Sequence, residues 1–164
     1  MRRMRTYRAV DVARHILSLS GNDGLTSGMT NMKLQKLVFF SQLAALQVYD
    51  TPIHSDPTMA WDFGPVVVDL YERVIGIVRN RDNKDLALSD PAVADAFADA
   101  EPIEDADALA VIQAAWNKFK EWTAYQLSDL THRRNSPWTI VYTKQRYDVI
   151  PLALIKERGF GDPD

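Results

Sequence analysis

NMKLQKLVFFSQLAALQVY, from Asn31 to Tyr49, is the stretch that decides the fold. Apolar and small side chains recur in it at helical spacing and extend over most of the helix surface: Leu34, Leu37, Val38, Phe39, Phe40, Ser41, Leu43, Ala45, Leu46 and Val48. A helix that is apolar on most sides is usually buried at the centre of its fold. The stretch therefore predicts a central helix that opens at Thr30-Asn31.

The charged side chains of this helix are confined to its first two turns, where Lys33 and Lys36 lie. A lysine near a helix N-terminus opposes the helix macrodipole, so contact with an acidic partner is one explanation for their position. Two solvated lysines are the other explanation. Under both interpretations we expect Lys33 and Lys36 to be exposed.

Helical signals continue on both sides of the central helix. Residues 7–19 carry one apolar face, and Thr6 is placed to cap them. Residues 50–63 contain two prolines and no helical period, which predicts a loop with one short extended piece. Pro65 fits the first position of the next helix, where its missing N–H costs nothing. Further helices are predicted at residues 91–97, 105–122, 123–130, 136–142 and from 151 to about 156.

Together these segments predict a mainly α fold. We expect a compact bundle of about seven helices in a single domain over residues 1–164, with one short extended segment around residues 52–62. A tail is expected from about residue 159. A chain of 164 residues suits a domain with one hydrophobic core.

The composition narrows the classes of function. The formal net charge is −3, so the chain as a whole gives no electrostatic case for binding nucleic acid. No apolar run is long enough to span a bilayer, no secretion signal follows the first arginines, and no cysteine is present. We therefore expect a cytoplasmic protein without membrane contact, disulfides or a thiolate metal site.

Charge is spread unevenly along the chain. Residues 85–107 hold eight acidic and no basic side chains, whereas arginines gather at positions 2, 3, 5 and 8. A run of one charge is usually a solvated loop or helix start. On charge alone, both regions are also candidate partner surfaces.

A second informative stretch is SDLTHRRNSPW, from Ser128 to Trp138. Ser128 and His132 lie four residues apart on one helix face, but Asp129 points about 100° away from Ser128. No G-x-S-x-G elbow and no Gly-rich phosphate loop is present, and the three histidines lack metal-ligand spacing. We therefore expect no catalytic, metal or cofactor site. Arg133 and Arg134 beside one tryptophan are too few to indicate a nucleic-acid contact.

The same stretch has a structural explanation. Its limits predict that His132 ends one helix and that Ser136-Pro137 starts the next, with serine as the cap and proline in the first turn. Basic side chains at a helix C-terminus interact favourably with its unpaired carbonyl groups. We expect His132 to fix the angle between the two helices, by packing on the Trp138 indole or by donating to a carbonyl.

Three blocks of sequence, in order, carry a resemblance to a known family. They are NMKLQKLVFF from Asn31, AWDFGPV from Ala60 with Tyr71 after it, and LSDLTH from Leu127 followed by Pro137-Trp138. Together they resemble the Panacea antitoxin domain, the SocA-like family that is also seen in phage-associated proteins. The resemblance extends over roughly residues 9–142. Phe63 and Phe40 depart from it mildly, since the family often has tyrosine at or beside these positions.

The resemblance implies an antitoxin of a type II-like toxin–antitoxin pair, without enzymatic activity and without a cofactor. Such a protein neutralises a cognate toxin by direct binding. The alternatives are an adaptor that delivers the toxin to a protease and a DNA-binding autorepressor, although nucleic acid is disfavoured by the net charge. Lys33, Lys36 and Arg133 are the expected partner contacts. One cluster of motif residues is expected to be structural or partner-facing: Trp61, Gly64, Pro65, Tyr71, His132, Pro137 and Trp138.

Overall fold

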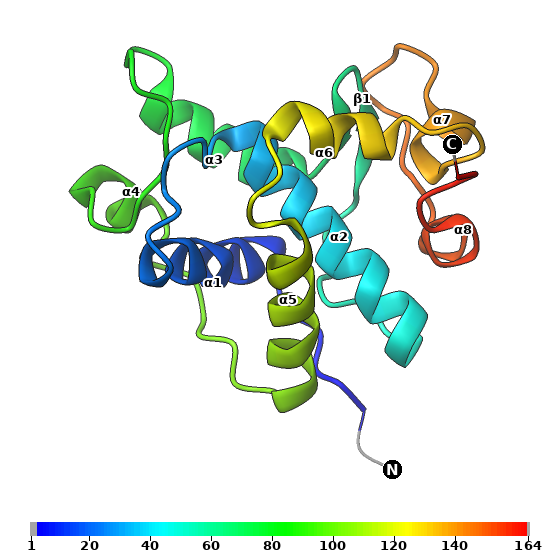
Figure 1. The fold of residues 1–164 in the computed structure, drawn as a ribbon, viewed down its shortest axis with the longest axis horizontal. Coiled ribbons are helices and arrows are strands. Elements are labelled where there is room, and N and C mark those ends of the chain that lie inside the picture. The colour runs from blue at the N-terminus through cyan, green and yellow to red at the C-terminus, as the bar shows by residue number, and fades with distance from the viewer. Residues whose placement is uncertain (1–2, 164) are drawn as a thin grey trace.

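Helix α2 (Asn31–Tyr49) runs through the middle of the molecule (Figure 1). The computed structural model describes residues 3–163. The Thr30 hydroxyl caps the helix by accepting a hydrogen bond from the Lys33 N–H at 3.4 Å. The helix ends at Asp50, which has the left-handed conformation that often stops a helix. The sequence therefore predicted both the place and the length of this helix correctly.

The other elements surround α2. In chain order they are α1 (Ala9–Asn22), β1 (Met59–Trp61), β2 (Gly64–Val66), α3 (Val68–Val78), α4 (Pro91–Ala96), α5 (Ala106–Phe119), α6 (Ala124–Thr131), α7 (Pro137–Val141) and α8 (Leu152–Arg158). Helices α1, α3, α5, α6 and α8 and strand β2 all contact α2. Over the described residues the fold is thus mainly α, as the sequence predicted, with eight helices where about seven were expected and one small two-stranded sheet.

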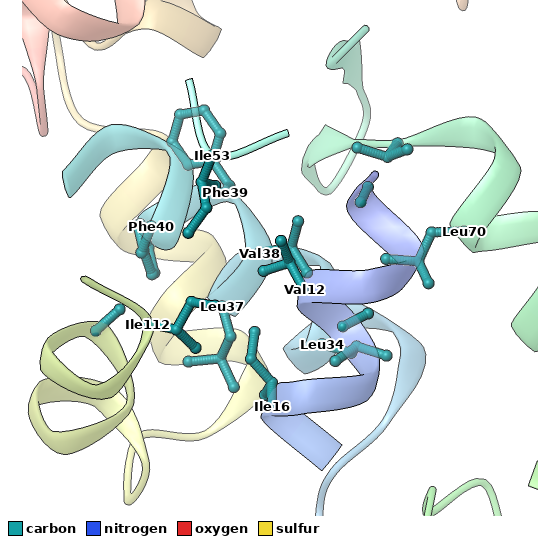
Figure 2. Close-up of a cluster of buried hydrophobic side chains, with 14 of the residues drawn as sticks. Val12, Ile16, Leu34, Leu37, Val38, Phe39, Phe40, Ile53, Leu70 and Ile112 are labelled. Carbon is teal, nitrogen blue, oxygen red and sulfur yellow. The ribbon is translucent and has the colours of Figure 1, made fainter. Parts of the chain in front are cut away.

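One hydrophobic cluster joins these elements. Figure 2 shows side chains of α1, α2, α3 and α5 meeting around the middle of α2. Its labelled members include Val12, Ile16, Leu34, Leu37, Val38, Leu70 and Ile112, all of which are fully buried. Burying one such side chain contributes about 1.5–3 kcal/mol. The core therefore makes α2 the element against which α1, α3, α5, α6 and α8 pack.

The predicted helix start at Pro65 is wrong. Pro65 lies in β2, which pairs antiparallel with β1 so that Ala60 faces Pro65 and Trp61 faces Gly64. Gly64 has φ +117°, a conformation that a helix cannot contain. A proline, which has no N–H to donate, is tolerated here because β2 is an edge strand that pairs only with β1 among the described strands. Helix α3 starts only at Val68, and β1 lies at the end of the region expected to be extended.

The first helix also starts later than predicted. Thr6 does not cap it, because its hydroxyl donates to the Pro52 carbonyl at 2.8 Å. The backbone of Tyr7 is held extended by hydrogen bonds to Ile53 and Ser55. Arg8 is the N-cap instead, and its N–H donates to the Asp11 carboxylate at 2.9 Å. The pairing of residue 7 with the segment after α2 therefore delays α1 to Ala9.

The two charged regions of the sequence pair with each other. Arg5 forms an ion pair with Glu101 at 2.5 Å, and Arg8 forms one with Asp99 at 3.5 Å. Arg73 of α3 also binds Asp99, at 2.6 Å. Exposed pairs of this kind contribute little to stability, because solvent screens them. They nevertheless hold Arg5 and Arg8 of the N-terminal segment against Glu101 and Asp99 of the acidic region.

Candidate functional site

The β1–β2 turn is held by side chains of α6 and α7. Three successive backbone carbonyls at its tip each lie within hydrogen-bond distance of one side chain. The Trp61 carbonyl accepts from Trp138 Nε1 at 2.6 Å, and the Phe63 carbonyl accepts from the Ser128 hydroxyl at 2.7 Å. Between them, the Asp62 carbonyl lies 3.2 Å from His132 Nε2. The second and third sequence blocks thus fasten to each other through this turn.

We call these contacts the clasp: the side chains of Ser128, His132, Trp138 and Tyr142 around the carbonyls of residues 61–63. The aromatic rings of the clasp pack against one another. The His132 and Trp138 ring centres are 3.7 Å apart, and Trp138 stacks on Tyr142 at 4.3 Å. The Tyr142 hydroxyl donates to the Asp62 carboxylate at 2.5 Å, which raises the pKa of Tyr142 above its usual value. The Tyr142–Asp62 hydrogen bond therefore ties these rings to the same β1–β2 turn whose carbonyls contact Trp138, His132 and Ser128.

His132 contacts the Trp138 ring and two backbone carbonyls at the end of α6 and the hairpin. It is the C-cap residue directly after α6, and its Nδ1 lies 2.5 Å from the Ser128 carbonyl. Ser136 then caps α7 by accepting from the Thr139 N–H, with Pro137 in the first turn. The Ser128 hydroxyl, which a hydrolase would pair with the imidazole, donates to the turn instead. The contacts of His132 join two helix ends to the hairpin.

Trp61 and Tyr71 extend the cluster along the hairpin. Their rings meet edge to face, with centres 5.1 Å apart. The Arg146 guanidinium also lies 4.5 Å from the centre of the Trp61 ring, and the Trp61 indole N–H donates to the Arg146 carbonyl. All seven residues of the expected motif cluster therefore lie in or beside this clasp: Trp61, Gly64, Pro65, Tyr71, His132, Pro137 and Trp138.

The expectation that Lys33 and Lys36 are exposed is wrong. Lys33 is 5% exposed and Lys36 is 1% exposed, because the α5–α6 connection covers one and the β1–β2 turn covers the other. The Lys33 amine donates to the Lys120 carbonyl at 2.7 Å. Burial lowers the pKa of Lys33, and it lowers the pKa of Lys36 to about 7.

A groove of about 810 Å³ opens where α2, α3 and the α5–α6 connection meet. We call it the aromatic groove; its apolar lining comprises Leu25, Met32, Ile75, Val78, Trp122 and Tyr125. Lys33, Arg79, Lys84, Lys120 and Glu121 also line it. Tyr125 is 72% exposed, which is a large apolar surface for a ring on a folded protein. The groove has the size and lining of a site that receives another molecule.

Sequence reasoning missed Trp122 and Tyr125. The capping box at Thr123 and Gln126 is the signal that finds them. A helix that starts directly after Thr123 leaves Trp122 outside α5, which ends at Phe119. The same start puts Tyr125 in the exposed first turn of α6.

The third expected partner contact, Arg133, lies at the surface. It is half-buried and lines a hollow of about 250 Å³ together with Trp122, Gln126, Asp129 and Leu130. Trp122 lines both this hollow and the aromatic groove. Arg133 and Lys33 are therefore brought to the two sides of one exposed indole, while Lys36 is not.

Lys36 lines a separate cavity of about 320 Å³, which we call the hairpin cavity. Its other side chains include Trp61, Asp62, Phe63, Tyr71, Lys144 and Arg146. Asn31, Met32 and Ile75 line both this cavity and the aromatic groove. The two hollows therefore share one wall, formed by the start of α2 and the middle of α3.

Comparison with known proteins gives one positive finding. The family model described as "Antitoxin SocA-like, Panacea domain" matches residues 34–139, which is more than half of the chain and includes all of the clasp up to Trp138. No curated protein and no solved structure matches the chain. Within residues 3–163, no helix is long and apolar enough to cross a membrane, and no three His, Cys, Asp or Glu side chains are grouped to hold a metal ion.

Proposed function

This chain belongs to the family of SocA-like antitoxins with a Panacea domain, and from that premise we propose that it is an antitoxin which neutralises a cognate toxin protein by direct binding. The family match supports a protein-binding role rather than an enzymatic one. The observation that carries the proposal further is the aromatic groove, where Trp122 and Tyr125 stand exposed beside an apolar wall.

The groove supports a docking site for an apolar segment of the toxin. Tyrosine and tryptophan are enriched among the residues that dominate binding energy at protein interfaces. A stable complex buries about 1,200–2,000 Å² in total, so the groove would form the centre of a larger interface. Arg79, Lys84 and Lys120 outnumber Glu121 at its edge. The toxin segment that fits best is therefore apolar with acidic flanks.

The expected partner contacts divide into two groups in this proposal. Lys33 lines the groove and Arg133 lies on the far side of Trp122, so both are positioned at the edge of the interface. The Lys33 amine is already bonded to the Lys120 carbonyl, and it acts by shaping the groove wall. Lys36 lies outside the groove and is not part of this docking site.

A growth assay tests the proposal. The product of the adjacent reading frame is expressed in bacteria alone and together with this chain, and the expected result is growth arrest that the chain relieves. Tyr125→Ala is expected to weaken toxin binding by about tenfold or more and to abolish the relief. Tyr147→Ala is the matched control, since Tyr147 is 85% exposed and lines neither hollow.

Two results would contradict the proposal. One is a toxic neighbour whose effect the chain does not relieve, and the other is equal relief by both tyrosine variants, which would remove the groove from the docking surface. The amount of toxin in relieved cells separates two modes of neutralisation. Sequestration leaves the toxin level unchanged, whereas delivery to a protease lowers it.

A further inference from the structure

The Lys36 amine is buried in the hairpin cavity without a partner. Its side chain is 1% exposed, yet among residues 3–163 no hydrogen bond or ion pair reaches it. The other buried lysine of the same helix differs, because the Lys33 amine donates to the Lys120 carbonyl at 2.7 Å. A buried charge is normally paired or hydrogen-bonded, since its desolvation costs several kcal/mol otherwise.

The charges around the cavity leave Lys36 uncompensated. The titratable groups that line the cavity with it are Asp62, Tyr71, Lys144 and Arg146. The Asp62 carboxylate accepts from the Tyr142 hydroxyl, and Arg146 lies over the Trp61 ring. His132 of α6 faces the Asp62 and Ser128 carbonyls. None of these groups is bonded to Lys36, and desolvation alone lowers its pKa.

The cavity is otherwise built to attract one negative charge. Three of its side chains are basic, Lys36, Lys144 and Arg146, against the single acid Asp62. Asn31 and Met32 place the first turn of α2 in its wall, so the positive end of a long helix dipole adds to the same field. Trp61 and Tyr71 provide flat apolar surfaces beside the charges. The volume of about 320 Å³ fits a small group.

We propose that the hairpin cavity binds a carboxylate group, with the buried Lys36 ammonium as its counter-charge and the Trp61 and Tyr71 rings as its walls. The carboxylate comes either from a free organic acid or from an aspartate or glutamate of a docked protein. In both cases the bound group replaces the solvation that Lys36 has lost. The proposal does not depend on the proposed antitoxin function.

Benzoate and its neutral isostere benzamide test the proposal on the purified chain. Isothermal titration calorimetry is expected to detect saturable benzoate binding at millimolar concentration and at least about tenfold weaker binding of benzamide. Lys36→Met is expected to weaken benzoate binding by about tenfold or more, because it removes the buried counter-charge. Lys33→Met is the matched control, a buried lysine of the same helix outside this cavity, and it is expected to bind benzoate like the wild type.

A second measurement uses the wild-type chain alone. Titrations at pH 8 in two buffers of different ionisation enthalpy count the protons that accompany benzoate binding. Since the pKa of unliganded Lys36 is about 7, its amine is mostly neutral at this pH and must be protonated to pair with the carboxylate. The expected result is an uptake approaching one proton for each benzoate bound.

Three outcomes would overturn the proposal: no saturable benzoate binding, equal binding of benzamide, or binding that Lys36→Met leaves intact. Once benzoate binding is established, the toxin identifies the source of the carboxylate. If Lys36→Met and added benzoate both weaken toxin binding, the carboxylate belongs to the toxin. If neither does, the site takes a free acid. The growth assay with Tyr125→Ala tests the aromatic groove, whereas benzoate binding tests the hairpin cavity. Either proposal can therefore fail while the other holds.

Discussion

The side chain of Lys36 passes so close to Gly64 that a β-carbon on residue 64 would lie only 2.7 Å from Lys36 Cε. Glycine has no β-carbon and so avoids this clash. The Thr131 hydroxyl lies 2.8 Å from the same point. Lys36, Gly64 and Thr131 belong to the three separate sequence blocks that carry the family resemblance. The three blocks therefore meet at one point of the β1–β2 turn. Lys36 and Thr131 leave no room there for a side chain on residue 64, which is why this position is a glycine.

Replacing Gly64 with alanine is expected to destabilise the protein by roughly 2–4 kcal/mol, because the new β-carbon meets Lys36 and because φ +117° is strained for any other residue. Gly76→Ala is the control. It lies within α3 with no atom near its added β-carbon, and the change is expected to stabilise the helix by about 0.5–1 kcal/mol. Urea unfolding of both variants measures the difference, and equal effects would contradict the packing of Gly64 described above.

Trp138→Ala is expected to cost about 3–5 kcal/mol, because the indole is 8% exposed, packs against His132 and stacks on Tyr142. Trp138→Phe keeps a ring but leaves the Trp61 carbonyl without its donor, and about 1–3 kcal/mol is expected. Trp122→Ala is expected to cost about 1 kcal/mol at most, since that indole lies at the surface. Thermal unfolding that ranks the three variants otherwise would show that the clasp does not hold the fold.

Lys36→Met is expected to stabilise the fold in a pH-dependent way. The pKa of Lys36 is about 7 in the folded chain against an ordinary value of 10.5. Between these values the unfolded chain holds a proton that the folded chain releases, so the stability of the wild type rises with pH across this window. The advantage of Lys36→Met over the wild type is therefore largest below pH 7 and shrinks toward pH 10.

Urea unfolding at pH 6 and pH 9 measures that advantage, which is expected to fall by a few kcal/mol between the two conditions. Comparison of the two proteins at each pH cancels the titration of all other groups. An advantage that is independent of pH would contradict the burial of an unpaired amine at residue 36.

Gln42 holds the segment that follows α2, as its side-chain carbonyl accepts from the Ile53 N–H at 2.7 Å and its amide donates to the His54 carbonyl at 3.0 Å. Gln42→Met keeps the size of the side chain but leaves these two backbone groups without hydrogen-bond partners. The free energy of unfolding is expected to fall by about 2–4 kcal/mol. Gln113→Met, on the outer face of α5, is expected to change stability by less than about 0.5 kcal/mol. Hydrogen exchange at Ile53 should rise selectively in the Gln42 variant, and unchanged protection there would contradict this role.

Helices with a strong apolar period or a capping residue were predictable from the sequence. Helix α2 has a long apolar run and a capping residue, Thr30, and Thr123 and Ser136 mark the starts of α6 and α7. Pro65 was misplaced because a Gly-Pro pair fits a helix start and a hairpin strand equally well in sequence. The pairing with β1 and the approach of Lys36 to Gly64 decide between them.

The candidate site was less predictable. Lys33 and Lys36 were expected to be exposed because they are charged. In the structure the α5–α6 connection and the hairpin cover the start of α2, which the sequence does not reveal. The aromatic groove combines residues from positions 25 to 125. Such a surface exists only after the elements have packed, so periodicity along one segment does not indicate it.

The most direct test of the central claim is calorimetric titration of the purified chain with the purified product of the adjacent reading frame. We predict a saturable complex of fixed stoichiometry, with affinity that falls by about tenfold or more in Tyr125→Ala and is unchanged in Tyr147→Ala. A neighbouring protein that is toxic in cells but forms no complex with the chain in this titration would contradict neutralisation by direct binding.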